Sequence, residues 1–371
     1  MSSRHDDKSA LKEYYTNEDE HGRDERDGHI NLSAPNEEPV SHLDVYDSQM
    51  YSKTSSSSAK PSGILNANWS EQRSKDKKLS TLRIPPRRLA FCGGGVRCVG
   101  HVGVLMALES ANLLGCVKEM IGISAGSLFA LLYVLGYTLK QIEELALKFD
   151  FALLGNIEPE DILLFPMTLG LNSGDAIDKL ITSILHQKGF NKDITFSELA
   201  KKTRMTFRCY ATELQKSKIK EMSVFSTPTM SVKTAVRASM SLPVLYSPVK
   251  DGDMLLVDGG LLHNLPLIFL TESEIQETIG VLFISGEPIA APIESVLDFF
   301  KYIYDGALMM RNIPYIQKYK EQLILIDTQE CGALSFNESE ENRSKFIEVA
   351  RNTTLAFLHT VSKPSRRVSV S

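Results

Sequence analysis

A serine stands between two glycines in the five residues Gly122-Ile123-Ser124-Ala125-Gly126. Two apolar residues, 120–121, precede them, and a long apolar, helix-like run follows at 128–135. Glycines two positions before and after a serine permit a sharp strand-to-helix turn, because a side chain at either place would collide with the neighbouring strand or helix. Such a turn holds the serine hydroxyl outward. The spacing therefore predicts an α/β chain in which Ser124 is a candidate nucleophile.

A glycine-rich loop precedes this turn in the chain. Residues 89–92 predict a short buried strand, and residues 99–113 predict a helix. Three glycines between a strand and a helix bring bare backbone N–H groups to a helix N-terminus, where they can hold an anion. The loop between the two elements consists of Gly93, Gly94, Gly95, Val96 and Arg97.

A carboxylate follows a later apolar strand. Residues 254–257 run directly into Asp258, and Gly259 and Gly260 come next. A carboxylate at a strand end can be brought close to another strand-end residue such as Ser124. Asp258 is therefore a candidate base for the serine. Taken alone, however, an Asp-Gly-Gly sequence is also a common turn.

This combination resembles the patatin-like phospholipase family. The three blocks occur in the family's order within residues 89–270, with lesser echoes at 103–105, 196–199, 235–239 and 242–243. The resemblance implies Ser124 as nucleophile and Asp258 as its base, a dyad without histidine. It also implies an oxyanion hole from the backbone around Gly94 and Gly95, with Arg97 beside it. The implied reaction is hydrolysis of acyl esters in membrane or micellar glycerolipids, without a metal or other cofactor.

One position departs from the family pattern. Family members usually have glycine directly after the basic residue of the glycine-rich block, and here that position is Cys98. A positive φ at Cys98 would strain the loop by ~1–3 kcal/mol. With a negative φ, Cys98 is a harmless small residue at the helix start, and this is favoured because the three glycines are intact. Arg97 itself is equally well interpreted as a surface cation.

Two alternatives to the dyad enzyme stay open. A Ser-Asp-His triad is compatible with the chain order, since His263 and His359 both follow Asp258. His263 lies in a loop, however, and His359 and His101 lie on predicted helices, where a lone histidine is more often structural. The second alternative is a lipid-binding or interaction protein whose altered glycine loop has lost useful turnover.

Composition excludes some classes of function. The 371 residues, 43% of them hydrophobic, allow a sizeable core, and a net charge of -5 provides no basic field for nucleic acid. Five cysteines without paired spacing and a polar start predict a reducing compartment, with the protein cytoplasmic or peripheral on a membrane. No run of 18 or more apolar residues is free of breaks, so no transmembrane segment is expected.

Strand-like and helix-like segments alternate, which predicts a three-layer α/β/α domain with a largely parallel central sheet and a site at the carboxyl ends of its strands. We expect a disordered polar region at 1–84, a patatin-like catalytic domain at 85–271, an extension of the same α/β domain at 272–361, and a disordered tail at 362–371. The predicted strands are 89–92, 120–123, 206–213, 223–226, 255–257, 278–284 and 323–327, and the predicted helices are 99–113, 125–135, 139–149, 174–186, 232–239, 293–310 and 338–361.

Three further segments have two interpretations each. The apolar run 163–171, broken by proline and glycine, favours packing in the core, and the alternative is a lid or a patch that contacts lipid. The aromatic stripe of 293–310 likewise favours core packing over membrane contact. Asp251 and Asp253 lack the spacing of a calcium loop, so Asp251-Gly252 predicts a hairpin turn and no metal is expected.

Overall fold

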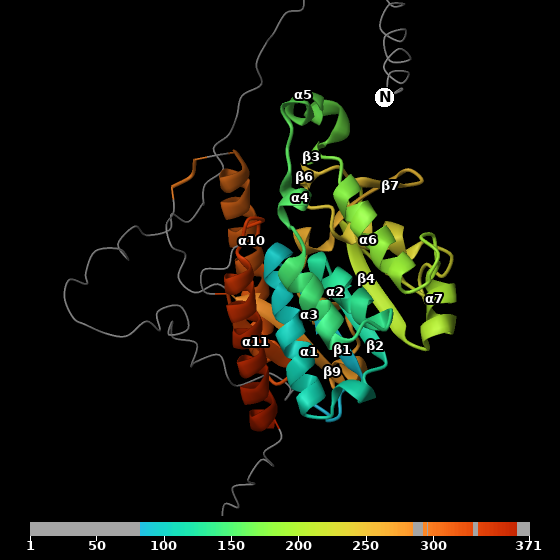
Figure 1. The fold of residues 1–371 in the computed structure, drawn as a ribbon, viewed down its shortest axis with the longest axis vertical. Helices are drawn as coiled ribbons and strands as arrows, with labels where there is room; N and C mark the ends of the chain where they lie inside the picture. Colours follow the sequence, from blue (N-terminus) through green and yellow to red (C-terminus); the bar gives the residue numbers. More distant parts are fainter. Residues whose placement is uncertain (1–81, 285–291, 295, 329–332, 362–371) are drawn as a thin grey trace, which may run out of the picture. The chain divides into compact units, whose positions relative to one another are not determined.

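The computed structural model describes residues 82–284, 292–294, 296–328 and 333–361. The disorder predicted for 1–84 and 362–371 therefore falls outside the described residues, except at 82–84. Figure 1 shows the described elements, which all belong to the compact unit formed by residues 61–371.

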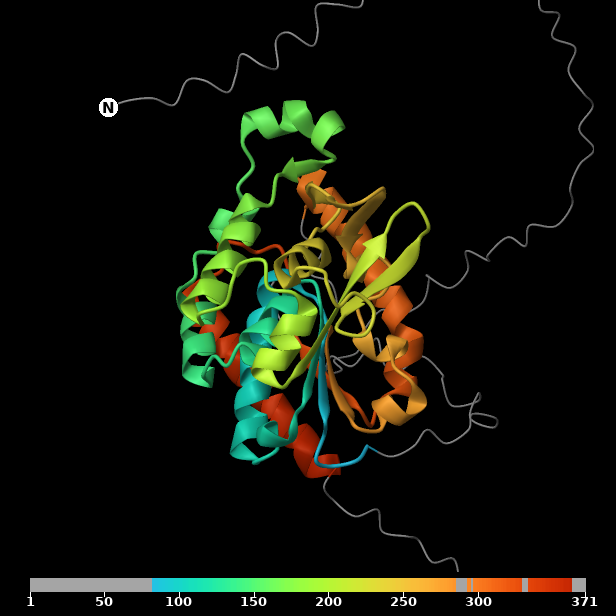
Figure 2. The ribbon, with the colours of Figure 1, turned by 90° about the vertical axis from the view of Figure 1, so that its right-hand side faces the viewer.

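A twisted central sheet organises this unit (Figure 2). The strand order is β10 (Leu323–Asp327), β9 (Thr278–Ile284), β1 (Arg88–Phe91), β2 (Glu119–Ile123), β4 (Thr206–Glu213), β8 (Met254–Asp258), β7 (Val249–Asp251). The strands from β10 to β4 are parallel, whereas β8 runs antiparallel to β4, as does β5 (Lys218–Ser223). The predicted α/β fold with a largely parallel central sheet is confirmed.

Helices cover both faces of the sheet (Figures 1 and 2). In β1, Leu89 and Phe91 enter the core on one face of the sheet, and Ala90 enters the core on the other, as does Cys92 directly after the strand. Burial on both faces explains why the inner strands are continuous apolar runs without alternation. The first face carries α1 (Gly100–Ser110), α2 (Ala125–Val134), α3 (Leu139–Lys148), α6 (Asp175–Gln187), α8 (Val232–Ser239) and α11 (Glu340–Val361), and the second carries α10 (Val296–Lys318).

The remaining elements are short. A two-stranded sheet pairs β3 with β6 in parallel. These elements are β3 (Gly170–Asn172), β6 (Val244–Tyr246), α4 (Ala152–Gly155), α5 (Pro159–Thr168), α7 (Phe196–Thr203), α9 (Glu272–Ile275) and the 3₁₀ turns η2 (Gly95–Val99), η3 (Leu114–Cys116), η4 (Gly259–Leu261) and η5 (Pro266–Phe269).

The strand predicted at 223–226 is wrong, because the chain turns there. The hydroxyl of Ser223 accepts the backbone N–H of Phe225 and of Ser226, which closes a side-chain-stabilised turn. The strand lies earlier, in β5, and Phe225 is 68% exposed.

The prediction that residues 163–171 pack in the core is also wrong. They form the end of α5 and the start of β3, and α5 buries none of its residues. Leu163 is 80% exposed and Met167 is 69% exposed. Figures 1 and 2 show α5 projecting beyond the small sheet. An apolar run is buried only where the tertiary structure supplies a surface to cover it, and no described element covers α5.

The predicted helix 293–310 is found as α10, which extends to Lys318. Core packing is wrong for three of its apolar residues, since Phe299, Ile303 and Met310 are 56%, 55% and 68% exposed. Farther along the helix, Tyr315 and Ile316 pack against the core on the second face of the sheet. Residues 296–298, 300, 301, 304, 305, 308 and 309 have side chains outside the described set.

A buried ion-pair cluster joins the amino ends of the central strands. Glu119 accepts hydrogen bonds from Arg88 Nε and Arg208 Nη2, each at 2.7 Å. We expect Glu119→Ala to lower the free energy of unfolding by roughly 3 kcal/mol, because it leaves two largely buried guanidinium groups short of a partner. Urea denaturation measures this change. The control is Lys148→Ala, which breaks an exposed pair with Glu144, and equal shifts in the two variants would contradict the prediction.

Candidate active site

The turn between β2 and α2 carries Ser124 in a strained conformation. Ser124 has φ 54° and ψ −138° and is the residue immediately before α2. A Cβ atom at Gly122 would lie 2.4 Å from the Cα atom of Ser127, and one at Gly126 would lie 2.3 Å from the carbonyl oxygen of Cys92. Both predicted glycines are therefore required by close approach of the neighbouring chain. A non-glycine residue with this backbone costs ~1–3 kcal/mol, which the surrounding contacts must offset.

Ser239 on α8 supplies one of those contacts. Its hydroxyl accepts the backbone N–H of Ser124 at 2.9 Å and donates to the carbonyl of Tyr210 in β4 at 2.7 Å. Ser239 is fully buried, so both bonds are shielded from water. In the sequence, residues 235–239 stand out only as an echo of a family pattern, because spacing alone does not show which backbone group a serine will reach.

Asp258 lies beside Ser124. It ends β8, is 2% exposed, and its carboxyl group interacts with the Ser124 side chain. Its Oδ1 also accepts the N–H of Gly260 at 2.7 Å. Burial raises the pKa of Asp258 from 3.8 to about 7, although the hydrogen bonds from Ser124 and Gly260 act in the opposite direction. A carboxylate with this pKa can exchange a proton near neutral pH.

The register of the sheet brings these two side chains together. Asp258 pairs with Ala211 in β4, one residue after the Tyr210–Ile123 pair of β4 and β2. This register places the last residue of β8 beside the carboxyl end of β2, where Ser124 follows. Gly259 takes part in this close packing, since a Cβ there would lie 2.5 Å from the carbonyl oxygen of Tyr210.

The glycine-rich loop lies against the serine turn. A Cβ at Gly93 would be 2.6 Å from the Cβ of Ser124. Asn264 holds Gly93 by two hydrogen bonds: its Oδ1 accepts the Gly93 N–H at 2.7 Å, and its Nδ2 donates to the Gly93 carbonyl at 2.9 Å. Within the described residues, no acceptor takes the N–H of Gly94 or Gly95. These two donors are therefore available to a ligand, whereas that of Gly93 is already used.

The rest of the loop is structural. The N–H of Val96 donates to the carbonyl of Ala333 at 3.0 Å, so Val96 does not offer a free donor. Arg97 is partly exposed, and its N–H donates to the carbonyl of Gly94 at 3.1 Å. Cys98 is fully buried and has no positive φ, so the departure from the family pattern does not strain the backbone.

His263 lies in the loop that follows Asp258 and η4. Its ring packs edge-on against Phe269 and Tyr315, with centroids 6.0 and 6.1 Å away. Burial and the charge of Arg311 lower its pKa. In the described part of the chain, it makes no hydrogen bond with Ser124 or Asp258.

The two histidines on helices, His101 and His359, lie in a buried and an exposed position. His101 is fully buried, stacks on Phe91 with centroids 4.1 Å apart, and has Nε2 3.0 Å from the carbonyl oxygen of Cys92. Burial lowers its pKa to about 3, so it remains neutral. His359 is exposed on α11.

We expect Asn264→Ala to slow ester hydrolysis by roughly 10–100-fold, because Gly93 loses both bonds that hold the donor loop against Ser124. Removing a full oxyanion donor costs about 10²–10³ in kcat, and displacement of the loop should cost less. The kcat for a short-chain ester measures the effect. Thermal unfolding is measured alongside, and a kcat within about twofold of wild type in a folded variant contradicts this role for Asn264.

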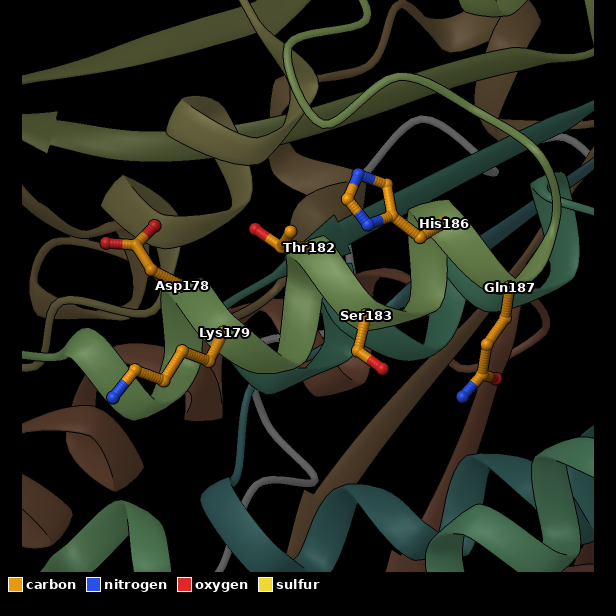
Figure 3. A pocket seen from close by; sticks show the side chains of 6 residues that line it. All are labelled: Asp178, Lys179, Thr182, Ser183, His186 and Gln187. Atoms are coloured by element: carbon orange, nitrogen blue, oxygen red, sulfur yellow. The ribbon is translucent and has the colours of Figure 1, made fainter.

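A surface hollow beside α6 is separate from these residues. Figure 3 shows its lining, which comes from α6 alone. No residue that contacts Ser124 or Asp258 contributes to it. The six lining residues are Asp178, Lys179, Thr182, Ser183, His186 and Gln187.

The predicted hairpin is present. β7 pairs antiparallel with β8, Gly252 in the turn has φ 59°, and Asp251 pairs with Lys220 at 2.7 Å. Among the described residues, no three His, Cys, Asp or Glu side chains are grouped so as to hold a metal ion. The helices in the same part of the chain include none that is both long and apolar enough to cross a membrane.

Residues 89–271 match the family model described as patatin-like phospholipase, a span that contains the serine turn, the glycine loop and Asp258. This segment of the chain is a patatin-like phospholipase domain. This patatin-like chain is 28% identical to the uncharacterized protein R571 of Acanthamoeba polyphaga mimivirus over 75% of its own length and 94% of that protein. It is 29% identical to the probable lipid hydrolase 463L of invertebrate iridescent virus 6, over 49% of its length and 62% of the relative.

A solved structure has the same fold. The crystal structure of VipD from Legionella pneumophila matches the patatin-like chain with a TM-score of 0.52 and 15% identity, over 77% of this chain and 69% of VipD. At this identity the likeness concerns the fold alone. The patatin-like domain and the lipid hydrolase relative support a lipid hydrolase as the general class of activity.

Proposed function

We propose that this protein hydrolyses fatty-acyl ester bonds of glycerophospholipids, as a phospholipase A, through Ser124 and Asp258. The observation that carries the proposal is the placement, by the sheet register, of a buried carboxylate with a pKa of about 7 beside a serine on a strained turn. A base with a pKa near the working pH combines the ionised state with a strong tendency to accept a proton. The relative described as a probable lipid hydrolase supports the same class of substrate.

Acylation is the first half of the reaction. Ser124 Oγ attacks the ester carbonyl carbon while its proton passes to the Asp258 carboxylate. The carbonyl oxygen becomes an oxyanion, which the free N–H groups of Gly94 and Gly95 stabilise at the start of η2. The tetrahedral intermediate then collapses, the bond to the lysophospholipid oxygen breaks, and that oxygen takes the proton from Asp258. The acyl group is left on Ser124.

Deacylation repeats these steps with water. A water molecule attacks the acyl carbonyl as Asp258 takes one of its protons, and the same two N–H groups hold the new oxyanion. Collapse breaks the bond to Ser124 Oγ, which recovers its proton from Asp258. The products are a free fatty acid and the starting enzyme, so the cycle requires no metal and no redox step.

The decisive experiment treats the purified protein with a fluorophosphonate and follows fatty-acid release from phosphatidylcholine vesicles. We expect covalent labelling at Ser124, loss of release after labelling, and normal release by His263→Ala. Loss of release in a folded His263→Ala variant would favour a histidine triad. Vesicle binding without labelling or release in the wild type would overturn the proposal and favour a lipid-binding protein.

A further inference from the structure

We propose that α5 is the surface on which this protein docks to a lipid layer, with the exposed apolar residues of α10 as a second contact. This inference rests on the proposed function, because it concerns how the dyad reaches a substrate that is packed in a membrane or micelle. Four features of the described residues carry it: the composition of α5, its attachment, its position relative to the dyad, and the placement of α10.

The exposed apolar residues of α5 are spread over more than half of the helix circumference. Ile162, Leu163, Leu164 and Met167 are 61%, 80%, 48% and 69% exposed. Three consecutive apolar residues point in three directions around a helix, since successive residues are about 100° apart. A protein groove covers one side of a helix, whereas an apolar layer surrounds it. An exposed apolar surface of this kind marks an interaction site, and immersion in lipid fits its shape.

The charges of α5 indicate the kind of lipid surface. Its acidic residues, Glu160 and Asp161, lie in the first turn, next to the capping residue Glu158, and the helix has no Lys or Arg. Anionic head groups would meet repulsion and no cation. The helix therefore fits a zwitterionic or neutral lipid surface, which it enters by the apolar side chains that follow the first turn.

The arm that carries α5 is held firmly at its base. The hydroxyl of Tyr246 donates to the carbonyl of Leu154 at 2.9 Å, and the N–H of Ser247 donates to the carbonyl of Asn172 at 3.0 Å. One bond lies before α5 in the chain and the other after it. The exposed helix is thus held out from the fold by specific contacts on both sides.

The base of the arm also adjoins the dyad. Arg237 on α8 donates to the carbonyl of Ser173, just after the arm, at 2.6 Å, and to the hydroxyl of Ser241 at 2.5 Å. The carbonyl of Ser241 in turn accepts the N–H of Asp258 at 2.8 Å. Since α8 also carries Ser239, which holds Ser124, one helix connects the arm to both members of the dyad. A lipid layer at α5 therefore meets the protein at the end where the ester must arrive.

The exposed apolar residues in the first turns of α10 also lie towards the carboxyl ends of the parallel strands. α10 ends at Lys318, shortly before β10 begins at Leu323, so its last turn lies near the amino ends of the parallel strands. Its earlier turns, with exposed Phe299 and Ile303, extend towards the carboxyl ends, beside the small sheet (Figure 2). Arg311 connects α10 to the loop after Asp258 by donating to the carbonyls of Leu261 and Leu262.

The chain offers a matched control. Phe225 is 68% exposed, like Met167, but follows β5, whose last residue pairs with Arg208 near the amino end of β4. It therefore lies near the amino ends of the parallel strands, whereas Ser124 and Asp258 lie near the carboxyl ends. An aspartate at Phe225 makes the same kind of change at one position as each of the two aspartates placed in α5, without touching the proposed surface.

The test compares wild type, Leu163→Asp/Met167→Asp and Phe225→Asp in co-sedimentation with phosphatidylcholine vesicles, with and without phosphatidylserine. We expect the double variant to bind vesicles at least ~10-fold more weakly, because burial of two apolar side chains is lost. Phe225→Asp should bind as the wild type does, and phosphatidylserine should not strengthen wild-type binding. Both variants replace exposed residues, and circular dichroism checks that they are folded.

Enzyme assays separate a failure of docking from a failure of the proposed function. The double variant should lose far more activity on vesicles than on a water-soluble short-chain ester. Equal binding by the double variant and the wild type overturns the docking surface, even if fatty-acid release is normal. An inactive wild type whose vesicle binding still depends on α5 overturns the hydrolase and keeps the docking surface. A wild-type dimer that the double variant converts to a monomer, with vesicle binding unchanged, assigns α5 to a second copy of the chain and also overturns docking.

Discussion

Ser124→Ala is expected to reduce fatty-acid release from phosphatidylcholine vesicles by at least ~10³-fold, because it removes the atom that attacks the ester. The Gly94 and Gly95 donors and the Asp258 carboxylate remain, so a small residual rate over water is expected. Initial rates at saturating substrate measure the loss in kcat. Vesicle binding should persist, since α5 is unchanged. A folded Ser124→Ala variant with a tenth or more of wild-type kcat would exclude Ser124 as the nucleophile.

Ser124→Gly is the matched variant that isolates the strain of the turn. It is as inactive as Ser124→Ala, but glycine adopts φ 54° and ψ −138° without the steric penalty of a side chain. We therefore expect its free energy of unfolding to exceed that of Ser124→Ala by roughly 1 kcal/mol. Urea denaturation of the two inactive variants makes the comparison, and an equal or lower value for the glycine variant would show that the turn is not strained.

The second large effect is the pH dependence set by Asp258. Its carboxylate must be ionised to accept the serine proton, and burial raises its pKa to about 7. We expect kcat/KM to increase about tenfold per pH unit up to a pH near this value and then to level off. The measurement is the pH profile for a soluble ester. A profile that is flat from about pH 5 to pH 8 would mean that the base has the ordinary pKa of an aspartate.

The same raised pKa makes Asp258 a cost to stability. The folded state holds this proton more tightly than the unfolded state, whose pKa is near 3.8, so stability declines as pH rises from about 4 to about 7. Asp258→Asn removes the buried charge. We expect it to abolish activity and to raise the free energy of unfolding by roughly 2–4 kcal/mol at about pH 8, with little gain at about pH 4. A loss of stability at both pH values would contradict this account of the carboxylate.

The elements that the sequence predicted well have a strong local signal. The predicted strands 206–213, 278–284 and 323–327 coincide with β4, β9 and β10, and the predicted helix 232–239 coincides with α8. Continuous apolar runs of strand length predict buried parallel strands, and apolar residues at helical spacing predict helices. The glycines at 122 and 126 are also a local signal: their spacing around Ser124 predicts a tight turn, and the neighbouring chain approaches both too closely for a side chain.

The predictions that failed depend on which surface lies opposite a segment. Apolar composition at 163–171 and in 293–310 favoured burial, yet α5 and part of α10 are exposed. Residues 223–226, predicted as a strand, instead form a turn closed by the Ser223 hydroxyl. In each case the local sequence allows two outcomes of similar free energy, and contacts with distant residues decide between them.

The sequence by itself determined the order and type of the main elements, the family, and the presence of a serine on a glycine-flanked turn with an aspartate downstream. Only the tertiary structure decided that Asp258 ends an antiparallel strand beside Ser124, and that Asn264 and Ser239 hold the glycine loop and the serine backbone. The physical reason is that local propensity depends on neighbours along the chain. Strand register, burial and the hydrogen-bond partners of buried side chains depend on residues far apart in the chain, and the bonds of Asn264 and Ser239 join residues more than 100 positions apart.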